Sequence, residues 1–149
     1  MCRATPRFRS GPGPAHPVTR AMRRGVAALR RAALRVRPAR TLLSIAIRGT
    51  GSPGPVETLL TDVQVDDLDI GSDGTVYLSS HPEDVLCRRP GAPAVRIAGP
   101  DESVLGSTAV ALDADEVNLI VVTDGAFVMA DLPDEPARIV RLEVSGRCR

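Results

Sequence analysis

Apolar residues between positions 41 and 149 fall into short runs that alternate with polar residues or with turn sequences. The runs predict strands over 42–47, 56–60, 66–70, 75–78, 85–87 and 95–97, because they are short and rich in β-branched residues. Gly and Pro concentrate in the turns at 49–55 and 89–93, and Asp73-Gly74 favours the positive φ of a hairpin turn. We therefore expect antiparallel hairpins without intervening helices, which excludes a parallel α/β sheet.

The order of these elements begins again about 42 residues later, which is the signature of an internal repeat. Residues 108–112 correspond to 66–70, residues 119–122 to 76–79, and residues 139–142 to 85–88. Four short strands in about 40–45 residues is the period of one β-propeller blade. The sequence therefore predicts an all-β fold, an incomplete propeller of about two four-stranded antiparallel blades.

The first 40 residues differ in character from the rest and are predicted as a separate leader. Residues 1–18 are rich in Pro, Gly and Arg, a composition typical of disorder. Residues 19–37 predict an amphipathic helix that ends before Pro38, with Arg on its polar faces and apolar residues at spacings of three and four: Met22, Val26, Leu29, Ala33 and Val36. The predicted organisation is a leader over 1–40 and a partial propeller over 41–149.

Charge is distributed unevenly between the two parts. Residues 1–56 contain 12 Arg and no acid, whereas all 18 acids lie in residues 57–149, and Lys is absent. A coding sequence of high GC content, typical of some bacteria, explains Arg without Lys. Four interpretations of the leader stay open: an organelle transit peptide, a helix on an anionic membrane surface, a non-specific phosphate binder, or a tail without function.

Composition also narrows the classes of function. The three cysteines, Cys2, Cys87 and Cys148, lack metal-site spacing, and we expect reduced thiols in a cytoplasmic protein. One Tyr and two Phe provide almost nothing for base stacking, so specific nucleic-acid binding is not expected. No apolar run approaches the roughly 20 residues of a transmembrane helix.

Several segments together resemble the C-terminal third of the gluconolactonase and regucalcin (senescence marker protein) family. They are Asp66–Arg88, Gly106–Val110, Val121–Thr123 and Ile139–Leu142, and the resemblance covers roughly residues 41–146. Members of this family are six-bladed propellers that use a divalent metal, calcium or similar, to open sugar lactones or related esters. The resemblance implies a truncated relative of these hydrolases.

The resemblance also implies a site. One family ligand is an Asp at the start of an innermost strand, and Asp66 occupies that position, although Asp67 stands where the family has Gly. His81 is expected on the same rim as Asp66, as a catalytic proton carrier or as an ordinary His in a surface turn. The other family ligands, a Glu and two Asn, have no counterpart, since Asn118 does not match. The isolated chain is therefore expected to be inactive.

Two hypotheses follow for the function. In the first, the chain is the remnant of a lactonase-type hydrolase, produced by a truncated gene, an alternative start or a frameshift. In the second, it is a non-enzymatic interaction module whose basic helix docks on anionic surfaces, and whose open sheet edges promote self-association. The long connection over 124–137, with its acids, is expected to be a solvated loop.

Overall fold

The computed structural model describes residues 31–36, 40–82, 84–127 and 135–149, and these residues form an all-β fold. Ten strands make three antiparallel sheets, none of them closed. Sheet A contains β1 (Arg31–Val36), β2 (Thr41–Ile47) and β3 (Pro53–Leu60). Sheet B contains β4 (Val65–Ile70), β5 (Val76–Ser80), β6 (Asp84–Arg88) and β7 (Ala94–Ala98). Sheet C contains β8 (Ser107–Leu112), β9 (Asn118–Thr123) and β10 (Arg138–Glu143).

The strands predicted from residue 41 onwards are confirmed, but the predicted helix is wrong where the structure describes it. Residues 31–36 form β1, which pairs with β2 from Arg31↔Ala46 to Val36↔Thr41. The short sequence RAALRV fits a period of two as well as a helical period, and pairing with the apolar β2 decides between them. Strand β1 thus lies before the predicted boundary at residue 40. The remainder of the helix and residues 1–18 lie outside the described residues.

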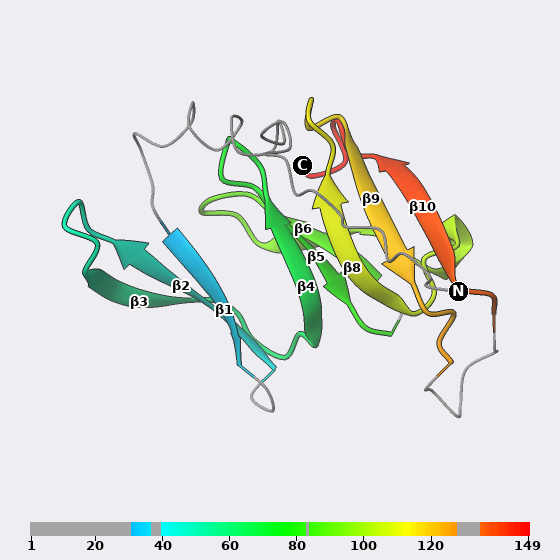
Figure 1. Ribbon diagram of the computed structural model, residues 1–149, viewed down its shortest axis with the longest axis horizontal. Coiled ribbons are helices and arrows are strands. Elements are labelled where there is room, and N and C mark those ends of the chain that lie inside the picture. Colours follow the sequence, from blue (N-terminus) through cyan, green and yellow to red (C-terminus); the bar gives the residue numbers. More distant parts are fainter. Residues whose placement is uncertain (1–30, 37–39, 83, 128–134) are drawn as a thin grey trace, which may run out of the picture.

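The three sheets follow one another along the longest axis of the molecule, in the order in which they occur in the sequence (Figure 1). Strand pairing confirms the internal repeat at the level of single residues. In sheet B, Asp69 pairs with Tyr77, and in sheet C, Ala111 pairs with Ile120 at the equivalent register. Both sheets also carry an irregularity at the same place, between Val65 and Asp67 in β4 and between Ser107 and Ala109 in β8.

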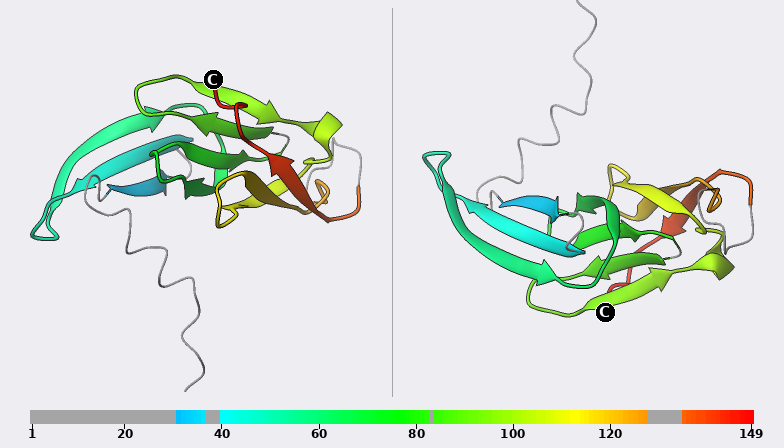
Figure 2. Two further views of the ribbon diagram at one scale, coloured as in Figure 1. Left: turned by 90° about the horizontal axis from the view of Figure 1, so that it is seen from above. Right: turned by 90° about the horizontal axis from the view of Figure 1, so that it is seen from below.

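Neighbouring sheets pack against each other through two clusters of apolar side chains. Figure 2 shows the arrangement of the sheets from above and below. Leu42 from sheet A packs with three buried residues of sheet B, Val65, Val76 and Leu78. A larger cluster joins sheets B and C: Val85, Cys87, Ile97, Ala98, Val104, Val110, Leu119, Val121, Leu142 and Val144. Burial of this apolar surface is the main force that holds the sheets together.

A disulfide ties the end of the chain to the core of sheet B. Cys87 on β6 is fully buried, and its sulfur is bonded to that of Cys148, with the two Cα atoms 5.8 Å apart. The expectation of reduced thiols is therefore wrong for these two residues. Spacing in the sequence could not reveal the pair, because 61 residues separate its members and only the fold brings them together. Cys2 lies outside the described residues.

Among the residues that the structure describes, no helix is both long and apolar enough to cross a membrane.

Candidate functional site

Asp66 lies at the start of β4, at the point where the strand has one residue more than its partner. Val65 pairs with Ser80 and Asp67 pairs with Ser79, so Asp66 is the extra residue of a β-bulge. The fully buried Ser79 hydroxyl stabilises the bulge by accepting a hydrogen bond from the Asp67 N–H at 2.9 Å. The equivalent position in sheet C is Thr108, so the repeat does not reproduce the carboxylate.

The two acids that follow Asp66 on β4 hold sheet C. The Asp67 carboxylate accepts a hydrogen bond from the backbone N–H of Val110 at 3.1 Å, and the Asp69 carboxylate accepts one from Leu112 at 2.7 Å. Hydrogen bonds to carboxylates are stronger than those between neutral groups, and these two join the strands β4 and β8 of neighbouring sheets. Asp67, the neighbour of Asp66, therefore joins sheet B to sheet C.

A third contact between these sheets joins their turns. The Glu116 carboxylate accepts hydrogen bonds from the N–H of Ser72 at 3.0 Å and from its hydroxyl at 2.8 Å. Tyr77 lies close to this contact, and its pKa is raised by burial first and then by the negative charges of Asp73 and Glu116. Tyr77 is therefore a neutral phenol at physiological pH.

His81 is buried and is not an exposed turn residue. Its side chain is 7% exposed, and its Nε2 lies 3.7 Å from Oδ2 of Asp124, which follows β9. The backbone N–H of His81 donates to Gln64 at 3.1 Å, and Val65 pairs with Ser80, so His81 and Asp66 lie at the same end of the β4–β5 hairpin. This contact between His81 and Asp124 is the arrangement closest to a proton-transfer pair in the described chain.

Gly106 forms backbone hydrogen bonds to both segments that carry His81 and Asp124. Its N–H donates to the Pro82 carbonyl at 2.6 Å, and its own carbonyl accepts from the Asp124 N–H at 2.8 Å. The residue has φ +70, and an added Cβ would meet the Asp124 carboxylate and the backbone nitrogens of Gly125 and Ala126. Only Gly fits this position. The sequence alone did not single out Gly106 or Asp124 for this role.

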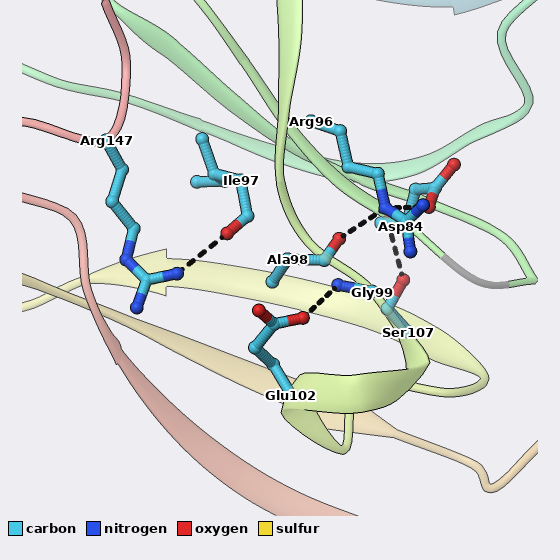
Figure 3. A network of polar contacts seen from close by, with 8 residues as sticks. All are labelled: Asp84, Arg96, Ile97, Ala98, Gly99, Glu102, Ser107 and Arg147. Atoms are coloured by element: carbon cyan, nitrogen blue, oxygen red, sulfur yellow. Dashed lines mark hydrogen bonds and ion pairs between the residues drawn. The ribbon is translucent and has the colours of Figure 1, made fainter.

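A polar network lies next to this segment, where the connection from β7 to β8 meets the start of β6 (Figure 3). The Arg96 Nε lies 2.8 Å from the Asp84 carboxylate, and the Asp84 carbonyl accepts a hydrogen bond from the Ser107 hydroxyl at 3.0 Å. An open hollow of about 290 Å³ adjoins it, lined by Arg96, Ile97, Ala98, Asp101 and Glu102. These contacts fix the connection from β7 to β8, and Arg147 adds a hydrogen bond to the Ile97 carbonyl at 2.9 Å.

The described residues do not fit a metal centre. They contain no group of three or more His, Cys, Asp or Glu side chains that could hold an ion. Asp66 contributes one carboxylate, while Asp67 and Asp69 are engaged with backbone N–H groups of β8. A hard cation such as calcium takes six to eight oxygen ligands, some of which can be water. Of the acids in the long connection, Asp131 and Asp134 lie outside the described residues.

Asp113 provides a testable electrostatic feature in the turn between β8 and β9. Its pKa is lowered from the ordinary 3.8, first by the hydrogen bond from the Asn118 side chain and then by the backbone N–H of Asn118. The folded-state pKa is depressed, so its contribution to stability is present above the unfolded-state value and is lost as pH falls through the folded-state pKa. We expect Asp113→Asn to destabilise the protein near neutral pH and to have little effect well below pH 3.8.

This prediction is checked by urea unfolding of the wild type and Asp113→Asn at several pH values between 7 and 2. Asp101→Asn serves as a control, since Asp101 is an exposed acid for which no comparable set of hydrogen bonds is formed in the described chain. A difference in unfolding free energy that persists unchanged to the lowest pH would contradict the assigned cause.

A scan against models of known protein families finds no match for this chain, and no curated protein matches it.

Proposed function

We propose that this chain is a section of a gluconolactonase-like β-propeller that acts by assembling with another sheet, and that it is not a hydrolase by itself. The proposal rests on one comparison within the repeat. In sheet B, Ser79 pairs with Val85, and at the equivalent register of sheet C, Val122 pairs with Ile139. Val85 is 0% exposed in the core between sheets B and C, whereas Ile139 is 77% exposed.

This difference in exposure points to a surface that receives a partner. Large apolar side chains that gather on one face mark interaction sites more often than single exposed residues do. The face of sheet C that points away from sheet B carries Ile139 beside Val122, which is 40% exposed. It corresponds by register to a face that sheet B buries, so its apolar character suits another packed sheet.

The lactonase-like relationship is supported by the fold and by the position of Asp66, but the site supports no catalysis by the isolated chain. Metal-assisted lactone opening needs an ion held with open coordination positions, and the described residues do not supply such a set. The His81–Asp124 contact is 3.7 Å long and involves a buried imidazole, which has little access to a substrate. The basic-helix alternative rests on residues 19–37, of which 31–36 form a strand and the others lie outside the described residues.

The proposal is tested by assaying hydrolysis of a sugar δ-lactone by the purified full chain, with added calcium, manganese or zinc and with a chelator. We expect no rate above the buffer control under any of these conditions, and identical traces for the wild type and Asp66→Ala. Metal-dependent hydrolysis above the buffer control would refute the proposal, and its loss in Asp66→Ala would show that the activity depends on Asp66.

A further inference from the structure

We infer that the outer face of sheet C binds sheet A of a second copy of this chain, so that two chains close into a ring of six sheets. This inference rests on the proposed function, because it names the partner of the assembling surface. It concerns the two ends of the row of sheets, which Figure 1 shows at its left and right.

The first of the two contact surfaces is the outer face of sheet C, which points away from sheet B. On β9, Leu119 and Val121 are fully buried against sheet B, so the alternating residues Ile120 and Val122 point to the other side. Cross-strand pairing extends this face over all three strands: Ala109, Ala111, Ile120, Val122 and Ile139 form its apolar part, and Arg141 and Glu143 lie beside them on β10. Small residues on β8 and large ones on β9 and β10 give a surface that another strand layer can approach closely.

The second contact surface is the outer face of sheet A, which points away from sheet B. Leu42 and Ser44 are buried, and Leu42 packs against sheet B, so Leu43 and Ile45 point to the other side. Ile45 pairs with Val56, which is 59% exposed, and Leu43 pairs with Thr58. This face is therefore apolar at its centre, as a packed sheet interface requires.

The way in which neighbouring sheets pack within the chain indicates that a second copy of the chain binds these two outer faces. Sheet A packs on sheet B through one face of B, and sheet C packs on the opposite face, so each contact joins two different faces. The proposed contact between C and A continues this established series. Repeated contacts between unlike faces form a ring if the rotation closes. Two copies supply six sheets, which lies within the roughly four to eight blades of known propellers.

The first test measures the mass of the full chain by light scattering after size exclusion, over a range of concentrations. We expect a dimer of twice 15.7 kDa. Ile139→Glu and Val122→Glu each place a charge in the proposed contact, and we expect at least a tenfold rise in the dissociation constant. Val117→Glu is the matched control, because Val117 has a similar exposure of 42% but lies in the turn before β9. The control should remain dimeric.

The second test mixes two variants with damage on opposite faces. Ile139→Glu alters only sheet C and Val56→Glu alters only sheet A, so each variant alone has two damaged contacts in the ring. A mixed dimer retains one contact between two unaltered faces, and we therefore expect mixing to restore part of the dimer population. Circular dichroism of each variant verifies folding, which Ile139 and Val56 should not affect because both are exposed.

A monomer at all concentrations, a dimer insensitive to Ile139→Glu, or growth into open polymers would each refute the closed ring. So would a failure of the mixed variants to recover any dimer. These outcomes are separate from the hydrolysis assay: a monomer without lactonase activity overturns this inference and leaves the proposed function standing, whereas metal-dependent hydrolysis overturns the proposed function whatever the oligomeric state.

Discussion

Cys148→Ser is expected to lower the free energy of unfolding by about 4 kcal/mol, the loop-closure value for a disulfide that spans 61 residues. The bond joins the last residues of the chain to the fully buried Cys87 on β6, between sheets B and C. Without it, the unfolded chain gains conformational freedom, and the segment around Val144 and Arg147 loses its anchor beside sheet B. Equilibrium unfolding in urea under oxidising conditions measures this loss.

Reductant provides the matched control for the disulfide. Treatment of the wild type with dithiothreitol should reproduce the stability of Cys148→Ser, and the reductant should leave Cys148→Ser itself unchanged. The double variant Cys87→Ser/Cys148→Ser separates the covalent bond from the effect of a free thiol in the core. If the wild type unfolds at the same urea concentration with and without reductant, the bond makes no contribution to stability.

Gly106→Ala is expected to destabilise the protein by about 3 kcal/mol, the combined cost of a strained backbone and of overpacking against atoms that cannot move aside. Gly106 has φ +70, and its added methyl group would meet the Asp124 carboxylate and the backbone nitrogens of Gly125 and Ala126. The resulting shift would also disturb the approach of Asp124 to His81, which lie 3.7 Å apart. Urea unfolding and the His81 imidazole resonances would report the two effects.

Gly91→Ala is the control for backbone strain alone. Gly91 has φ +74, nearly the same as Gly106, but nothing lies within 4 Å of the position that its Cβ would occupy. We expect a cost of about 1 kcal/mol for this variant, from the left-handed backbone conformation. Equal costs for the two variants would show that the close approach at Gly106 has no energetic consequence.

The candidate site was only partly predictable from the sequence. Asp66 was singled out by the resemblance to a family ligand position at the start of a strand, and the structure places Asp66 near the start of β4 with His81 at the same end of the hairpin. The burial of His81 and its contact with Asp124 were not predictable from the sequence. The two residues are 43 positions apart, and only the packing of sheet C on sheet B brings the end of β9, where Asp124 lies, beside His81. The hydrogen bond from the Val110 N–H to the Asp67 carboxylate was not predictable either, because it depends on which strand lies beside β4.

The sequence by itself determined the strands from residue 41 onwards, the turns and the repeat of about 42 residues, because period-two alternation and Gly or Pro punctuation are local signals. Tertiary structure decided three further points. It made residues 31–36 a strand through pairing with β2, it joined Cys87 to Cys148, and it left Ile139 exposed where the repeat buries Val85. Each of these depends on which sheet lies beside another, and long-range packing determines that arrangement.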